Sequence, residues 1–166
     1  TNPGMAAHLY RLIEQEANLT GNETVWDLYC GVGAIGLFLA DKARQVAGFE
    51  LQKEAVRAAR HNAEKLGYTH CTFHAGDICP DLCRHLPSPD VIIADPPRSG
   101  LSGQAIEMLK AVPAKKLLYV SCNPSTQARD AAALATDWTP VKSLPLDMFP
   151  FTPHVENLLV LERRKG

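Results

Sequence analysis

A cysteine follows closely on an apolar run in the second half of the chain. Residues 117–126 read LLYVSCNPST, a pattern typical of a buried strand, then Cys122, then a turn that contains Asn and Pro. A thiol in this place is either an inert buried cysteine of the kind common in protein cores or a nucleophile held at the edge of a parallel sheet. The segment alone favours the inert cysteine, so its surroundings must decide.

Three glycines mark a second segment with chemical potential. DLYCGVGAIG, residues 27–36, places Gly31, Gly33 and Gly36 in the spacing G-x-G-x-x-G at a predicted strand-to-helix turn. Glycines let the backbone approach a ligand and let a helix pack on a strand, whichever cofactor binds there. Glu50 ends the next predicted strand and can accept hydrogen bonds from both hydroxyls of a ribose, which suits NAD and S-adenosylmethionine equally.

Two aspartates near this turn bear on the choice of cofactor. Asp27, at the end of the first predicted strand, would repel a pyrophosphate but is compatible with the positive sulfonium and amino groups of S-adenosylmethionine. This favours S-adenosylmethionine over NAD. Asp77, after the third predicted strand, is placed either to reach the adenine amino group or to cap a helix that follows it.

A stiff loop ends the fourth predicted strand. DVIIADPPRSGL, residues 90–101, contains Asp95 followed by two prolines, which fix their own φ angles and lack N–H donors. Such a loop at the carboxyl edge of a parallel sheet is suited to clamp a flat base. Amino-directed methyltransferases carry a similar motif with an aromatic residue in the fourth place, where this chain has Arg98, so methylation of an exocyclic amine is disfavoured.

The elements that must position these residues alternate along the chain. Short apolar runs and longer helical patterns alternate up to residue 137, which is the signature of an α/β domain. Two later β-rich runs, 138–147 and 154–163, are joined by so short a link that they must be antiparallel. The sequence therefore predicts five parallel strands finished by an antiparallel hairpin, the sheet of class I S-adenosylmethionine-dependent methyltransferases. The predicted strands are 24–28, 45–50, 70–74, 90–94 and 116–121, and the predicted helices are 3–18, 34–43, 52–66, 103–111 and 125–136.

Composition limits the possible functions. A length of 166 residues with 46% hydrophobic content suits one domain, residues 1–166, and the start at Thr1 suggests a piece of a longer protein. The net charge of −1 lacks the basic footprint of a domain that holds nucleic acid alone. Five scattered cysteines favour free thiols, and no metal site is expected. Without a signal sequence or a membrane-spanning run, the chain is predicted to be cytoplasmic.

The predicted position of Cys122 now favours a nucleophile over an inert buried cysteine. Carbon 5 of uracil is a poor nucleophile, and addition of a thiolate to carbon 6 creates an enolate with electron density at carbon 5. Cys122, at the carboxyl end of the fifth predicted strand, faces the same crevice as Asp95. A base must later remove the proton from carbon 5.

At this point the sequence resembles the RNA uridine-5-methyltransferases, especially the bacterial 23S rRNA (uracil-5)-methyltransferases. The motifs that carry the resemblance cover nearly the whole chain, and the last two are specific to the family. They are DLYCGVGAIGLFLA, FELQKEAVRAARHNAEKLG, DVIIADPPRSGL, LLYVSCNPST and LDMFPFTPHVENLLVLER.

The resemblance implies an activity and its residues. Cys122 matches the nucleophile and Glu156 the base, while Tyr29, Glu50 and Asp95 match positions that contact S-adenosylmethionine, with Asp77 a further candidate. It also implies an RNA substrate, 23S rRNA before tRNA, positioned by N-terminal domains that lie outside this chain, where an iron–sulfur cluster occurs in some members. Two alternatives remain: a binding module that holds S-adenosylmethionine without turnover, and an NAD-binding domain supported only by the glycine spacing.

Overall fold

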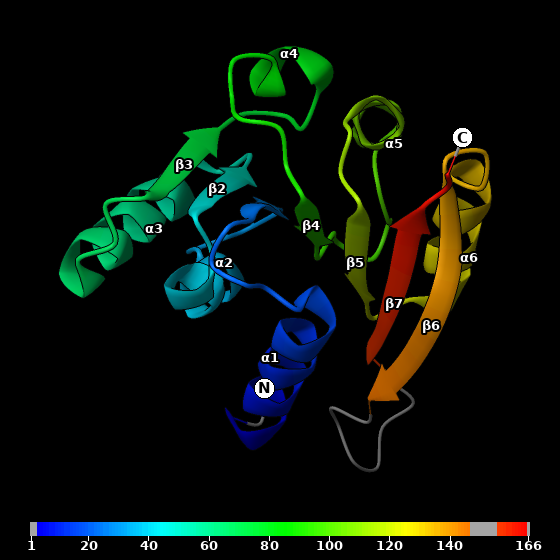
Figure 1. The fold of residues 1–166 in the computed structure, drawn as a ribbon, viewed down its shortest axis with the longest axis horizontal. Coiled ribbons are helices and arrows are strands. Elements are labelled where there is room, and N and C mark those ends of the chain that lie inside the picture. The colour runs from blue at the N-terminus through cyan, green and yellow to red at the C-terminus, as the bar shows by residue number, and fades with distance from the viewer. Residues whose placement is uncertain (1–2, 147–155, 166) are drawn as a thin grey trace.

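The computed structural model describes residues 3–146 and 156–165, and within them one seven-stranded sheet forms the centre of the fold (Figure 1). The helices are α1 (Pro3–Ala17), α2 (Ala34–Leu39), α3 (Lys53–Leu66), α4 (Pro80–Cys83), α5 (Gly103–Ala111) and α6 (Pro124–Ala133), with a 3₁₀ turn, η1, at Ala40–Lys42. The strands are β1 (Thr24–Leu28), β2 (Gln45–Glu50), β3 (Cys71–Ala75), β4 (Val91–Ala94), β5 (Lys116–Ser121), β6 (Trp138–Leu146) and β7 (Glu156–Arg163).

The order of the strands confirms the predicted architecture and adds a detail. The sheet runs β3-β2-β1-β4-β5-β7-β6, with β1 to β5 parallel and the last two strands antiparallel to their neighbours. The hairpin thus joins the sheet through its second strand, β7, which lies between β5 and β6 (Figure 1). This arrangement brings residues at the start of β7 beside those at the end of β5.

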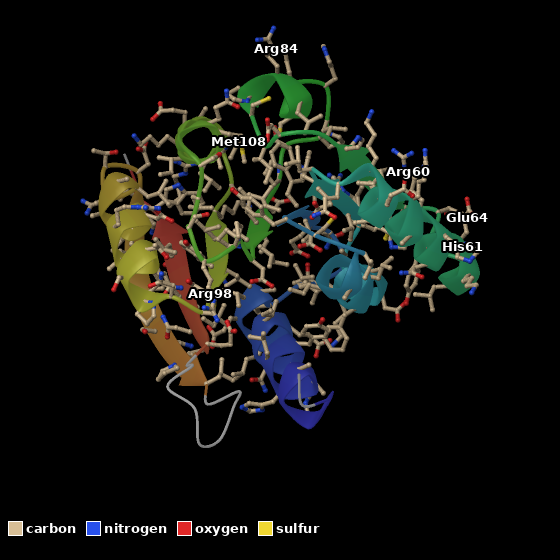
Figure 2. The ribbon with its side chains drawn as sticks, turned by 180° about the vertical axis from the view of Figure 1, so that it is seen from behind. Arg60, His61, Glu64, Arg84, Arg98 and Met108 are labelled. Carbon is tan, nitrogen blue, oxygen red and sulfur yellow. The ribbon has the colours of Figure 1, made fainter. Side chains whose placement is uncertain are left out.

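Alternation along the strands divides the core into two faces. On β1, Trp26 and Leu28 belong to the cluster that contains buried residues of α5, whereas Val25 packs with buried residues of α1 and α2. Successive side chains of a strand point to opposite faces, so helices on both sides cover the parallel sheet. On α3, Val56 and Ala59 are buried and His61 points to solvent (Figure 2).

Several boundaries differ from the prediction for local reasons. The helix predicted at 34–43 ends at Leu39 and continues as η1, after which Ala43 is extended and β2 begins. The helix predicted at 125–136 is α6, which begins one residue earlier, because the Asn123 side chain caps it by accepting from the Ser125 and Thr126 N–H groups. Within the described residues, every helix is too short or too polar to cross a membrane.

Candidate active site

The glycine turn between β1 and α2 is shaped by backbone conformation and close packing. Tyr29 has φ 60°, a left-handed conformation that is uncommon for a residue with a side chain, and Gly31 follows with φ 54°. Gly33 has φ 81°, and a Cβ there would lie 2.9 Å from the ring of Phe73. A Cβ on Gly36 would lie 2.9 Å from Oδ2 of Asp27. Both the turn and the helix that follows it therefore require glycine.

Asp27 lies beneath this turn and outside the lining of the cleft beside it. Its Oδ2 accepts a hydrogen bond from the Gly36 N–H at 2.8 Å, while its buried Oδ1 has no hydrogen-bond partner among the described residues. Burial raises the pKa of Asp27 to about 7, the hydrogen bond from Gly36 opposes this rise, and the nearby Asp95 charge adds to it. The protein thus holds a carboxyl group at the foot of the turn that is part protonated near neutral pH.

Glu50 connects the end of β2 to the glycine turn. Its Oε2 accepts a hydrogen bond from the Gly31 N–H at 3.1 Å, and its Oε1 accepts one from the Gln52 N–H at 2.9 Å. A carboxylate has about four lone-pair directions, so each oxygen retains the capacity to accept one more hydrogen bond from a ligand.

A cleft of about 800 Å³ opens at the carboxyl edge of the sheet beside this turn. Four of the predicted cofactor residues line it: Tyr29, Glu50, Asp77 and Asp95. Of the remaining three, Gly31 and Gly33 belong to the adjoining turn and Asp27 to the end of β1 beneath it. The rest of the wall is formed by Leu51, Gln52, Gly76, Ile78, Pro97, residues 99–103, Ile106, Arg129 and Asp130.

The cap alternative for Asp77 does not match the fold. The short helix α4 begins at Pro80, and its N-cap is Cys79 with no side-chain cap bond. Asp77 instead lines the cleft. It stays a predicted adenine contact.

The cleft carries more negative than positive groups. Glu50, Asp77, Asp95 and Asp130 line it, against the single guanidinium of Arg129. Burial, and then the charge of Glu156, raise the pKa of Asp95 to about 6. Such a cleft disfavours a pyrophosphate and favours a ligand that carries positive charge near the acids.

The two predicted catalytic residues flank the last paired residues of β5 and β7. Strands β5 and β7 pair up to Ser121 opposite Asn157. Cys122 follows Ser121 directly and Glu156 precedes Asn157, so the predicted nucleophile and base each adjoin one member of this last pair. Glu156 also acts on the pKa of Asp95, which places it near the loop after β4. Cys122 is partly exposed, and His154 lies outside the described residues.

The other four cysteines, Cys30, Cys71, Cys79 and Cys83, are also free thiols, and two of them, Cys30 and Cys83, are buried. Burial raises the pKa of Cys30, that of Cys71 to about 11, and that of Cys83 to about 12. These thiols are therefore protonated at neutral pH. In the part of the chain that the structure describes, no group of three His, Cys, Asp or Glu side chains could hold a metal ion.

Polar residues on the inner face of α6 were missed by sequence reasoning. Gln127 donates from Nε2 to the Tyr119 carbonyl at 2.9 Å, and its Oε1 accepts from Asn157 Nδ2 at 2.7 Å. Asp130 is fully buried and accepts from the Leu101 N–H at 2.7 Å. A signal was present, because positions 123, 127 and 130 lie on one face of a helix in the spacing usual for core residues.

Comparison with known proteins agrees with this architecture. A family model described as a methyltransferase domain matches residues 19–143. The chain belongs to this family, and its fold is that of class I methyltransferases.

Particular relatives are longer than this chain. It is 42% identical to an uncharacterized RNA methyltransferase of Nitratidesulfovibrio vulgaris and 44% identical to one of Porphyromonas gingivalis, over 99% and 98% of the chain. In each case the chain spans 36% of the relative's length. Among solved structures, it matches the Pyrococcus abyssi tRNA (uracil-54, C5)-methyltransferase in complex with S-adenosyl-L-homocysteine. That match has a TM-score of 0.80 and 35% identity, and covers 94% of this chain and 38% of the other.

Proposed function

We propose that this chain is the catalytic domain of an RNA methyltransferase that transfers a methyl group from S-adenosylmethionine to carbon 5 of a uridine. The observation that carries the proposal is the pairing of β5 with β7, in which Ser121 lies opposite Asn157. Cys122 follows Ser121 and Glu156 precedes Asn157 in the chain, so this pairing supports a common site for the two residues. This pair lies at the carboxyl edge, near Asp95, and Asp95 also lines the cleft. A thiol, a carboxylate and a cofactor cleft are the three parts that this reaction needs.

The residues present fit S-adenosylmethionine. Glu50 retains acceptor capacity for two ribose hydroxyls, and Leu51, Ile78 and Pro97 supply apolar wall for a flat adenine. The acidic lining suits the positive sulfonium and ammonium groups, and it opposes the pyrophosphate of NAD. The Pyrococcus abyssi relative, which contains S-adenosyl-L-homocysteine, supports the same cofactor.

The roles of the two catalytic residues follow from uracil chemistry. The Cys122 thiolate bonds to carbon 6, and the electron pair of the 5,6 double bond moves to carbon 5. S-adenosylmethionine supplies an electrophilic methyl group, which carbon 5 takes up as S-adenosylhomocysteine departs. Glu156 then accepts the carbon 5 proton, the 5,6 double bond re-forms, and the carbon 6–sulfur bond breaks to return the thiolate.

The identity of the RNA is the finer part of the proposal. We place 23S rRNA first, because LLYVSCNPST and LDMFPFTPHVENLLVLER resemble the bacterial 23S rRNA (uracil-5)-methyltransferases. A tRNA is the second candidate, favoured by the similarity to the Pyrococcus abyssi tRNA (uracil-54, C5)-methyltransferase. The net charge of −1 supports a division of labour in which other parts of the whole protein hold most of the RNA.

The test is a methyl-transfer assay with the whole protein, methyl-labelled S-adenosylmethionine, and transcripts of 23S rRNA and of tRNA. We expect label in 5-methyluridine of the rRNA, and loss of that label in Cys122→Ala. Cys71→Ala is the matched control, since Cys71 is also a partly exposed free thiol but lies at the start of β3. Label in another base, or full activity in Cys122→Ala, contradicts the proposal, and label confined to tRNA selects the second candidate.

A further inference from the structure

A fully buried carboxylate on α6 forms part of the cleft wall. Asp130 has no exposed surface, and its Oδ2 accepts hydrogen bonds from the Leu101 N–H and from the Tyr119 hydroxyl, both at 2.7 Å. Its Oδ1 accepts from the Arg129 guanidinium, from Nε at 2.9 Å and from Nη2 at 2.7 Å. Asp130 also lines the cofactor cleft. Its charge is therefore paired and its oxygens are directed at named groups.

The segment Asp95–Leu101 lies directly against α6 through such contacts. The Arg98 carbonyl accepts from Asn123 Nδ2 and from Thr126 Oγ1, each at 3.2 Å. The Ser99 carbonyl accepts from Arg129 Nη2 at 2.8 Å. Figure 2 labels Arg98 on this segment. Helix α6 and its cap residue thus hold the backbone of the loop at Arg98, Ser99 and Leu101.

Gly100 shows how close the loop and Asp130 are. Gly100 has φ 82°, and a Cβ at this residue would lie 2.4 Å from Asp130 Oδ2, well inside van der Waals contact. The loop therefore needs glycine in order to turn and to let the carboxylate approach. Because the Leu101 N–H points at the same oxygen, the turn and the hydrogen bond form one unit.

Burying a carboxylate on the inner face of a helix costs folding stability, so its presence here calls for a functional reason. The inner face of a helix is ordinarily apolar, and a buried carboxylate lowers stability unless its charge is paired and its oxygens are satisfied. Burial, and then the hydrogen bond to Asp130, raise the pKa of Tyr119, so its hydroxyl stays protonated and donates. The hydrogen bonds that Asp130 accepts fix the orientation of the loop relative to α6, which apolar contacts alone do not specify.

We propose that Asp130 is a positioning residue that fixes the Asp95–Leu101 segment, and with it the wall of the cleft, relative to Cys122. Helix α6 begins at Pro124, two residues after Cys122, so one rigid element carries the thiol loop and holds the loop of Asp95. The inference rests on the proposed function, because the wall that Asp130 fixes is the one that would receive S-adenosylmethionine. Asp130 acts through the loop, and no chemical step is assigned to it.

The first test is amide hydrogen exchange of residues 97–103 in the whole protein. Asp130→Ala should speed exchange of the Leu101 amide by at least about tenfold, because its acceptor is removed. Asp130→Asn should restore most of the protection, since the amide oxygen still accepts. The control is Leu39→Ala, a change of a fully buried residue of α2 that belongs to the core cluster on the other face of the sheet from Leu101.

The second test is a calorimetric titration with S-adenosylhomocysteine, in which stoichiometry reports the folded fraction and the dissociation constant reports the site. Asp130→Ala should raise the dissociation constant about tenfold and Asp130→Asn about threefold, at parent stoichiometry. Leu39→Ala should lower the melting temperature and leave the dissociation constant unchanged. If Asp130→Ala does not fold, Asp130→Asn and Tyr119→Phe carry both measurements.

The outcomes separate this inference from the proposed function. Parent-like exchange at Leu101 together with a parent-like dissociation constant in the Asp130 variants overturns the positioning role. A parent protein that binds no S-adenosylhomocysteine contradicts the proposed cofactor, and the exchange comparison then decides the role of Asp130 alone.

Discussion

The two halves of the carboxyl edge are constructed differently. Around β1 and β2 the site is shaped by backbone conformation and close packing, with left-handed residues and glycines that admit no Cβ. Around β4, β5 and β7 it is shaped by side chains that bond to backbone groups, as Asp130 does to Leu101 and Gln127 to Tyr119. Under the proposed function, the first half would hold a cofactor that many proteins share, and the second would orient groups for one reaction.

This contrast assigns separate tasks to the two halves. The cofactor half contains Tyr29, Glu50 and Asp77 and should govern affinity for S-adenosylmethionine. The reaction half contains Cys122 and Glu156 and should govern the chemistry on the uridine. Asp95 links them, because it lines the cleft and its pKa responds to Glu156. Variants of each half should therefore alter different measured quantities.

The largest expected effect is that of Cys122→Ala. Without the thiol no bond to carbon 6 forms, so turnover should fall by at least about 10⁴-fold, or about 5.5 kcal/mol in the activation free energy. The affinity for S-adenosylhomocysteine should stay within about twofold, because Cys122 does not line the cleft. Rates are measured by methyl transfer and affinity by calorimetry. A large loss of affinity would contradict the assignment of cofactor binding and chemistry to separate halves of the site.

Asp27→Asn tests the buried carboxyl group of the cofactor half through pH. Burial raises the pKa of Asp27 from 3.8 to about 7, so between these values the folded protein keeps a proton that the unfolded chain has lost. Deprotonation of Asp27 in the unfolded chain alone therefore lowers the free energy of unfolding of the parent as pH rises from about 4 to about 7. The variant lacks the titration, so its stability relative to the parent should grow across that window by at most about 4 kcal/mol.

Denaturant unfolding of both proteins at several pH values between 4 and 8 measures this difference. A stability difference that does not change with pH would show that Asp27 titrates normally. It would also contradict the conclusion that the Asp27 carboxyl group, whose buried Oδ1 has no hydrogen-bond partner among the described residues, is part protonated near neutral pH.

The smallest of these three effects is expected for Glu50→Ala. Losing hydrogen bonds to a charged acceptor should weaken binding of S-adenosylmethionine by about 1.5–3 kcal/mol, with turnover at saturating cofactor nearly retained. Glu50→Gln is the control, because it keeps an acceptor for the Gly31 or Gln52 N–H and should lose less. Calorimetry gives the affinity. An unchanged dissociation constant in Glu50→Ala would remove Glu50 from the cofactor site.

Local sequence patterns predicted most of the fold. Apolar runs gave the five parallel strands to within a residue, because buried parallel strands are nearly continuous in hydrophobic character. The insertion of β7 between β5 and β6 was not predicted, since either strand of a hairpin can pair with the sheet and the pattern is similar in both. The end of α2 was also misjudged, because Ala40 to Ala43 favour helix locally and the start of β2 overrides them.

The site was predicted in part. Tyr29, Glu50, Asp77 and Asp95 were expected together and all line one cleft. Asp130 and Gln127 were missed, because charged and amide residues on a helix are usually solvated, and this expectation outweighed the spacing that sets them on one helix face. The approach of Gly100 to Asp130 joins residues thirty apart in the chain, and no local pattern indicates it.

The most direct test of the central claim, that Cys122 and Glu156 act as a pair on one uridine, is a search for a trapped adduct in the whole protein with Glu156→Gln. Glutamine nearly preserves the shape of glutamate but does not accept the carbon 5 proton, so addition and methyl transfer should proceed while release stops. The account predicts a denaturation-resistant protein–RNA species that carries label from the methyl group of S-adenosylmethionine and is lost when Cys122→Ala is added. Normal turnover by Glu156→Gln with no such species would contradict it.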